Sequence, residues 1–263
     1  MSVPKIMGIL NITNDSFYDG GRFLNEKAIY LQAEKLIKEG VDIIDLGAYS
    51  SRPGAMDISE ELEVERLKLG LKVVKSISEN IPISVDTFRA SVARKAIDHG
   101  GDIINDISGG NLDEEMFKTV SELNVPYILM HMVGNPQNMS QNTYYDHLLM
   151  DMLIYFSKKL KQLTQFGIKD VIIDVGFGFS KTIPQNYTLM NNLGCFQMLN
   201  APLLVGISRK SMIYNVLETS AEKALNGTSV LNAISILKGA KILRVHDVKI
   251  AKEVITLTNL ISS

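Results

Sequence analysis

Short apolar runs alternate with longer stretches of helical periodicity along the whole chain, without a break in composition. Runs rich in β-branched residues indicate strands, and apolar residues spaced three and four apart indicate helices. The predicted strands are residues 6–10, 43–46, 83–85, 103–104, 127–130, 171–173, 203–207 and 242–245.

Amphipathic stripes are clearest in three of the segments between these strands. The predicted buried faces are Ile29, Ala33, Leu36 and Ile37 in the first, Leu67, Leu71 and Val74 in the second, and Ile250, Val254, Leu257 and Ile261 in the last. Gly40 and Gly100 stand where helices are expected to end, and Asn25, Ser59 and Asp113 are predicted N-caps.

This spacing of strand–helix units predicts a (β/α)8 TIM barrel, because such barrels take about 250 residues. We expect one domain over residues 1–263, with the functional site at the C-terminal strand ends. A doubly wound sheet shares the alternation, but it would spread its strand-end polar groups along an open edge.

Composition narrows the possible partners. The chain has 263 residues, 46% of them hydrophobic, a formal net charge of -2 and a pI near 6.1, so it offers no global positive field for nucleic acid or an anionic membrane. The single cysteine, Cys195, excludes an intramolecular disulfide, and we expect it to pack in a helix. No run approaches the roughly 20 apolar residues of a membrane span, which predicts a cytoplasmic protein.

Polar side chains gather where the predicted strands end. Acids and amides end the earlier strands, and cations follow the last two, an inventory that helix capping alone does not require. The set comprises Asn11, Ser50, Ser51, Arg52, Asp86, Asn105, Asp106, His131, Asp174, Ser208, Arg209, Lys210, Arg244 and His246. Such a rim can hold hydrogen-bond donors at one end of a ligand and an anion at the other. We expect His131 to be structural, and His99 and His147 to lie on solvated faces.

Two strand–helix connections, residues 12–24 and 48–58, are longer and richer in Gly, Asn, Asp, Ser and Pro than the others. Because most such connections take about two to six residues, we expect both to be mobile lids over the site.

The strand-end motifs resemble the dihydropteroate synthase family, the folate-pathway enzymes that sulfonamides inhibit. The resemblance spans nearly the whole chain and keeps the order and approximate spacing of the family's motifs. Its segments are residues 7–21 (MGILNITNDSFYDGG), 50–55 (SSRPGA), 84–87 (SVDT), 104–110 (INDISGG), 130–132 (MHM), 174–179 (DVGFGF), 208–211 (SRKS) and 244–248 (RVHDV).

The resemblance implies that the chain joins 6-hydroxymethyl-7,8-dihydropterin diphosphate to p-aminobenzoate and releases pyrophosphate. It implies a pterin site made of Asp86, Asn105, Met130, Asp174, Phe179, Gly206, Lys210 and Arg244. A carboxylate suits the donor edge of the pterin, because charge-assisted hydrogen bonds are strong.

The resemblance also implies sites for the other substrate groups. Asn11, Arg52, Arg244 and His246 would hold the diphosphate, with Asn11 as the one protein ligand of Mg²⁺. Phe17, Ser51, Pro53, Phe179 and Ser211, with Asp15 from the first loop, would surround p-aminobenzoate. The catalytic set is then Asn11, Asp15, Arg52, Lys210, Arg244 and His246, without a protein nucleophile. The partners would be small-molecule substrates and a second copy in a homodimer.

Some positions depart from the family's usual pattern. Asn14 and Val175 each replace a proline, Tyr49 replaces a glutamate, and Ser180 replaces a frequent glycine. Two alternatives stay open from sequence: a methyltetrahydrofolate-dependent corrinoid methyltransferase on a related barrel, and a catalytically silent pterin-binding paralogue. The corrinoid methyltransferase binds no diphosphate, so it has no use for the basic groups at residues 208–210, 244 and 246.

Overall fold

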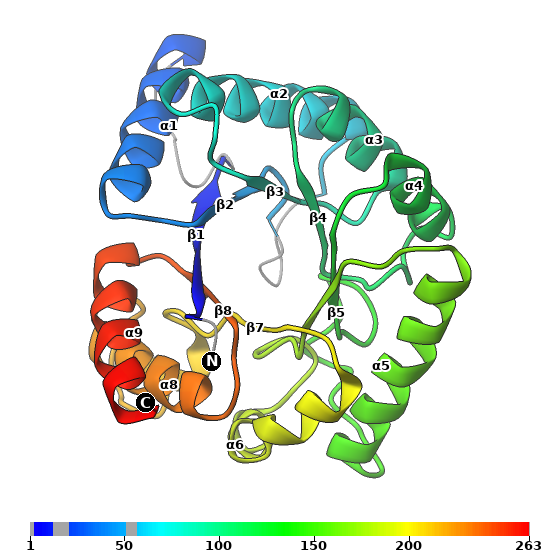
Figure 1. Ribbon diagram of the computed structural model, residues 1–263, viewed down its shortest axis with the longest axis vertical. Helices are drawn as coiled ribbons and strands as arrows, with labels where there is room; N and C mark the ends of the chain where they lie inside the picture. The colour runs from blue at the N-terminus through cyan, green and yellow to red at the C-terminus, as the bar shows by residue number, and fades with distance from the viewer. Residues whose placement is uncertain (1–2, 13–20, 51–56, 263) are drawn as a thin grey trace.

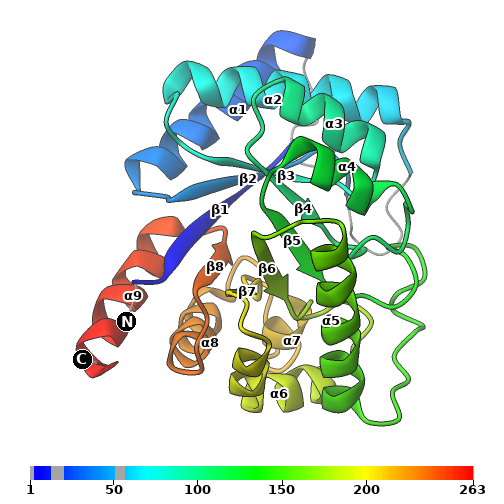
Figure 2. The same ribbon diagram turned by 45° about the vertical axis from the view of Figure 1, so that its right-hand side comes forward.

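Parallel strands close into a barrel in which each strand pairs with the next along the chain and β8 pairs with β1. Figure 1 looks into this ring, and Figure 2 shows the helices covering its outer side. The computed structural model describes residues 3–12, 21–50 and 57–262. The closed order confirms the predicted TIM barrel and excludes an open doubly wound sheet.

The strands are β1 (Lys5–Asn11), β2 (Ile43–Gly47), β3 (Ile83–Asp86), β4 (Ile103–Asp106), β5 (Tyr127–Met130), β6 (Val171–Asp174), β7 (Leu203–Val205) and β8 (Ile242–Val245). The helices are α1 (Gly21–Lys38), α2 (Glu60–Ile77), α3 (Ala90–Asp98), α4 (Met116–Leu123), α5 (Leu148–Gln165), α6 (Ile183–Asn191), α7 (Ser211–Tyr214), α8 (Leu225–Leu237) and α9 (Val248–Ser262), with a 3-10 helix, η2, at Leu193–Leu199. Each predicted strand is present, although β7 ends before residues 206–207. Within the described ranges, no helix combines the length and apolar character needed to cross a bilayer.

The predicted helix boundaries are partly confirmed. Ser59 caps α2 by accepting a hydrogen bond from the amide of Leu62, and Gly40 and Gly100 adopt the positive φ expected after helix ends. The N-cap prediction for Asn25 was wrong, because α1 begins at Gly21 and takes in the end of the first predicted loop.

Asp113 serves a different helix from the one predicted. One carboxylate oxygen accepts from the amide of Glu115 just before α4, at 3.0 Å. The other accepts from the amide of Ala90, the first residue of α3, at 2.7 Å. It therefore links two neighbouring helix starts.

The stripe predicted for the last helix was also wrong. Its buried face is Val248, Ala251, Ile255 and Thr258, whereas Leu257 and Ile261 are exposed. The buried face contains a threonine and the exposed side contains leucine and isoleucine, so residue type alone misassigned the face. Cys195 was likewise predicted to pack but is exposed on η2.

The interior of the barrel is filled in layers. A lower apolar layer gathers side chains from most of the strands: Met7, Ile43, Ile103, Ile128, Ile172, Leu204 and Ile242. Because successive strand residues point to opposite faces, residues two positions further along also point inward. That alternation brings polar side chains above this layer and begins the candidate site.

Candidate active site

Even-numbered strands supply one polar layer inside the barrel. Asp45, Asn105, Asp174 and Arg244 each stand two residues after an isoleucine of the apolar layer, on β2, β4, β6 and β8. TIM barrels commonly build such a layer from alternate strands, usually with aliphatic side chains. A polar layer in this place gives up apolar packing and so lowers stability. Proteins accept such a loss mainly at functional sites.

Arg244 binds two carboxylates from neighbouring strands. Its Nε donates to Asp45 Oδ2 at 2.6 Å, and its Nη2 donates to Asp86 Oδ2 at 3.1 Å. Burial alone would lower the pKa of Arg244, but the charges of Asp45 and Asp86 more than reverse that effect. Burial, followed by repulsion from Asp45, raises the pKa of Asp86 to about 7. Arg244 is therefore tied from β8 to β2 and β3 by two ion pairs.

Asn105 is fixed by the same acid. Its amide nitrogen donates to both oxygens of Asp45, at 3.1 and 3.3 Å. That arrangement leaves the amide oxygen of Asn105 as its acceptor for other groups. Asp45 thus orients both Asn105 and Arg244, although sequence reasoning did not select it.

Asp174 and Lys210 face each other at the end of β6. Asp174 Oδ1 accepts from the amide of Gly176 at 2.8 Å, and burial raises the pKa of Asp174 against the opposing charge of Lys210. Lys210 Nζ donates to the carbonyl of Phe177 at 2.5 Å and lies 4.7 Å from the ring centre of Phe179. Burial lowers the pKa of Lys210 to about 8. A Cβ on Gly206 would lie 3.9 Å from Asp174 Oδ2, so Gly206 is the neighbour of that oxygen on the next strand end.

An apolar wall stands beside these polar groups. Met130 and Phe179 belong to a cluster with Ile107, Met132, Met139 and Phe88, separate from the layers between strands and helices. The structure therefore brings both predicted apolar wall residues to one side of the polar layer.

His246 and Ser208 are joined across the ends of β7 and β8. The hydroxyl of Ser208 lies 2.9 Å from His246 Nδ1 and accepts from the His246 amide at 3.2 Å. Although part of the histidine is exposed, burial of its ring and the charge of Arg244 lower the pKa of His246 to about 4. His246 is neutral at pH 7 and offers a hydrogen bond rather than a charge.

Arg209 does not belong to the mouth, contrary to the cationic cluster predicted from its neighbours. Its Nε and Nη2 bind the two oxygens of Asp247 at 2.8 and 2.9 Å, and its Nη1 donates to backbone carbonyls before α8. The left-handed backbone at Arg209, with φ +56°, turns its side chain away from Lys210. This bidentate ion pair has a structural role.

Of the remaining predicted site residues, two are among the residues that the structure describes and the others are not. Asn11 ends β1, with its amide oxygen 3.0 Å from the point where a Cβ on Gly47 would stand, and Ser211 begins α7. Both are half-buried. Asp15, Phe17, Ser51, Arg52 and Pro53 lie outside the described residues, as does Asn14.

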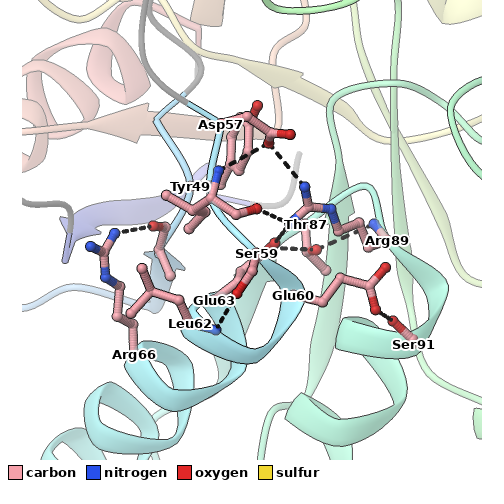
Figure 3. Close-up of polar contacts among 12 residues, drawn as sticks. Tyr49, Asp57, Ser59, Glu60, Leu62, Glu63, Arg66, Thr87, Arg89 and Ser91 are labelled. Atoms are coloured by element: carbon pink, nitrogen blue, oxygen red, sulfur yellow. Dashed lines mark hydrogen bonds and ion pairs between the residues drawn. The ribbon is translucent and has the colours of Figure 1, made fainter.

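A buried ion pair anchors the chain just after residues 51–56 (Figure 3). Glu63, fully buried in the first turn of α2, accepts from Arg89 Nη1 at 2.8 Å and from the hydroxyl of Thr87 at 2.7 Å. Arg89 also donates to Asp57 Oδ1 at 3.0 Å and to the carbonyl of Ile58 at 2.9 Å. The end of the second long connection is thus tied to the strand that carries Asp86.

Tyr49 adds a link between three strand–helix connections. Its hydroxyl accepts from Gln137 Nε2 at 2.7 Å, and its ring packs edge-on against Phe88 with 5.0 Å between centres. The guanidinium of Arg89 lies 5.4 Å from the Tyr49 ring centre. A tyrosine in place of the family's glutamate therefore has its own hydrogen-bond and ring partners.

Ser180 departs from the family's glycine under strain, because its φ is +46°. Its hydroxyl oxygen accepts from the amide of Val133 at 2.9 Å. We expect Ser180→Ala to lower the free energy of unfolding by about 1 kcal/mol, since the partly buried amide of Val133 loses its acceptor. Ser180→Gly should cost about 1 kcal/mol less, because glycine relieves the left-handed strain. Urea denaturation of both variants measures the difference, and equal costs would contradict the assignment.

Comparison with known proteins gives a consistent result. A family model described as "Pterin binding enzyme" matches residues 7–246. Dihydropteroate synthase of Haemophilus influenzae is 41% identical over 252 residues, covering 94% of this chain and 90% of that protein.

Solved structures agree with that comparison. The Yersinia pestis dihydropteroate synthase in complex with a sulfonamide drug superposes with a TM-score of 0.91 at 33% identity, covering 100% of this chain and 96% of that one. The Xanthomonas albilineans dihydropteroate synthase with 4-aminobenzoic acid superposes with a TM-score of 0.92 at 31% identity, covering 99% of this chain and 93% of that one.

Proposed function

Because this chain belongs to the dihydropteroate synthase family, we propose that it joins 6-hydroxymethyl-7,8-dihydropterin diphosphate to p-aminobenzoate, giving 7,8-dihydropteroate and pyrophosphate. The chain is a transferase, as are the members of that family. The observation that carries the proposal is the polar layer of Asp45, Asn105, Asp174 and Arg244 next to the apolar wall.

The polar layer suits the two edges of a pterin ring. Asp174 keeps an oxygen beside Gly206, where it can accept from ring N–H groups, and Asn105 keeps its amide oxygen for the same edge. Lys210 can donate to a ring carbonyl oxygen, and Arg244 can lie against the ring face. A missing partner would strand buried polar groups, so this set discriminates strongly against other rings.

The diphosphate requires compensation of several negative charges. Asn11, Arg244 and His246 are proposed to face it, together with Arg52. In the part of the chain described, no group of three or more His, Cys, Asp or Glu side chains could hold a metal. One half-buried amide oxygen, from Asn11, fits Mg²⁺, which keeps several waters and binds substrate phosphates. When bound, Mg²⁺ would neutralise charge that develops on the leaving diphosphate.

The chemistry needs no protein nucleophile. The bond between the pterin methylene carbon and the diphosphate oxygen breaks, and the positive charge left on the methylene spreads into the ring. The amine of p-aminobenzoate then forms the new carbon–nitrogen bond and loses a proton to solvent. Carboxylates around the ring can stabilise the cation electrostatically. Ser211 and Phe179 are proposed to contact p-aminobenzoate, with Asp15, Phe17, Ser51 and Pro53.

The assay for this function measures labelled pteroate from the pterin diphosphate, labelled p-aminobenzoate and Mg²⁺. We expect turnover by the unmodified protein, a loss of at least about tenfold in Lys210→Ala through its missing charged donor, and unchanged turnover in the exposed control Lys223→Ala. No pteroate above the Lys210→Ala level would contradict the proposal. Pterin binding without turnover would instead favour the silent paralogue.

The outer wall of the barrel carries exposed apolar side chains. Exposed apolar side chains on the outer helices, among them Val230 and Leu237 on α8 and Leu257 on α9, support a homodimer formed through that wall. The cytoplasmic location predicted from composition stays a prediction.

A further inference from the structure

Lys181 is a buried lysine that sequence reasoning did not select, and burial lowers its pKa to about 7. It is 7% exposed and makes no ion pair with any carboxylate in the described part of the chain. Its Nζ instead donates to the carbonyls of Phe179 and Gly176, at 2.9 and 3.0 Å, and lies 3.2 Å from His131 Nδ1. Burying an ammonium is costly, so these contacts need a compensating role.

Both carbonyls belong to the turn between β6 and α6, which follows directly from Asp174. The turn passes through left-handed conformations at Gly176, Gly178 and Ser180. Such a path directs the carbonyls of Gly176 and Phe179 toward Lys181. The Gly176 carbonyl also accepts from the amide of Phe179 at 3.1 Å, whereas the Phe179 carbonyl accepts from Lys181. One ammonium satisfies both ends of the turn.

The middle of the turn is held by other groups. Lys210 donates to the carbonyl of Phe177, and the side chain of Asn186 accepts from the amide of Gly178 at 2.7 Å. Lys181 therefore joins the residues next to Asp174 to Phe179, the residue of the apolar wall, and it does so beside the backbone hydrogen bond from Phe179 to Gly176.

His131 completes the environment of the ammonium. It is 4% exposed, and burial, followed by the charge of Lys181, lowers its pKa well below the ordinary range. A neutral imidazole can present Nδ1 as an acceptor to a charged lysine. The predicted structural role of His131 thus takes a specific form, as a support for Lys181.

We propose that Lys181 is a positioning residue for the pterin site, acting through the β6–α6 turn to hold Asp174 and Phe179 against the ring. The proposal rests on the proposed function and deepens it. Lys181 does not contact the substrate itself. Its removal takes the side-chain donor from the Phe179 carbonyl and one of two donors from the Gly176 carbonyl. The carboxylate and the aromatic wall then lose their relative placement, while the barrel strands keep theirs.

The test compares Lys181→Met with Lys169→Met, the same substitution at an exposed lysine just before the opposite end of β6. Binding of 6-hydroxymethylpterin is measured by isothermal titration calorimetry. The kcat and the KM for each substrate are measured in the labelled-pteroate assay described above. We expect Lys181→Met to raise the pterin Kd and the KM for the pterin diphosphate at least about tenfold, with kcat lowered less. The KM for p-aminobenzoate should rise less than that for the pterin diphosphate, because of the two groups that Lys181 positions only Phe179 is proposed to contact p-aminobenzoate. Lys169→Met should match the unmodified protein.

A role confined to folding would give a different result. In that case Lys181→Met would change the urea midpoint and leave the pterin Kd of the folded fraction unchanged, which overturns the proposal. If Lys181→Met does not fold, Lys181→Gln replaces it: its uncharged amide is one atom shorter and cannot reach both carbonyls, so the same rise in pterin Kd is expected. An unchanged Kd in Lys181→Gln would also overturn the proposal. Failure of the unmodified protein to bind the pterin or form pteroate would instead count against the proposed function.

Discussion

Asp174→Asn is expected to lower kcat/KM for the pterin diphosphate by about a thousandfold or more. The variant can still accept from the amide of Gly176 through its side-chain oxygen, so the local backbone is retained. Its amide nitrogen would then face the donor edge of the pterin, replacing charge-assisted hydrogen bonds, worth about 1.5–3 kcal/mol each, with a donor–donor clash. Steady-state kinetics with the pterin substrate varied give the measurement.

Asp170→Asn is the matched control, because Asp170 is exposed just before the opposite end of β6. It should keep the kinetic constants of the unmodified protein. Thermal denaturation should show both variants folded at the assay temperature. A loss in Asp174→Asn below about tenfold would remove this carboxylate from the pterin site.

Arg89→Met is expected to lower the free energy of unfolding by about 3–5 kcal/mol, because it leaves the fully buried Glu63 without its cation. Burial already raises the pKa of Glu63, and losing Arg89 raises it further. A carboxyl whose folded-state pKa lies above its unfolded value loses stability as the pH rises past the ordinary carboxyl range. The loss should therefore be larger at pH 8 than at pH 5, as measured by urea denaturation.

Arg94→Met provides the comparison for that variant. Arg94 pairs with Glu122 on the surface, with side-chain exposures of 45% and 47%. Exposed pairs contribute about 0–1 kcal/mol, so this change should cost little and vary little with pH. Equal costs for the two arginine variants would show that the buried pair does not anchor α2.

Periodicity was enough to predict the barrel. Every predicted strand exists because buried parallel strands are continuous apolar runs, and the helices between them are long enough to cover the outside. The face of α9 could not be predicted in this way, because that helix carries apolar residues on more than one side.

The site was predicted less completely, because adjacent residues on a strand point in opposite directions. Asn105 points into the barrel and binds Asp45, whereas Asp106 points outward, where it accepts from the hydroxyl of Tyr127 at 2.6 Å. The sequence places one amide, Asn105, and one acid, Asp106, at the end of β4, but it does not show which of the two side chains points into the barrel. Lys210 and Arg209 diverge for another reason, because they follow β7 in a turn whose backbone is left-handed at Arg209.

Asp45 and Lys181 were missed for a related reason. Asp45 interrupts an apolar run, Ile43-Ile44-Asp45-Leu46, and that interruption was the available signal. Its partner Arg244 lies at the other end of the chain, so only closure of the barrel brings them together. Lys181 follows a glycine-rich segment and resembles an ordinary surface lysine until the turn folds over it.

The shared guanidinium of Arg244 has a consequence for electroneutrality. Among the described groups of the polar layer, two carboxylates, Asp45 and Asp86, share the one guanidinium of Arg244, and Asp174 interacts electrostatically with Lys210. The cavity therefore carries little surplus positive charge of its own. A polyanionic substrate entering alone would give the cavity a net negative charge, and a divalent counterion arriving with it would reduce that charge.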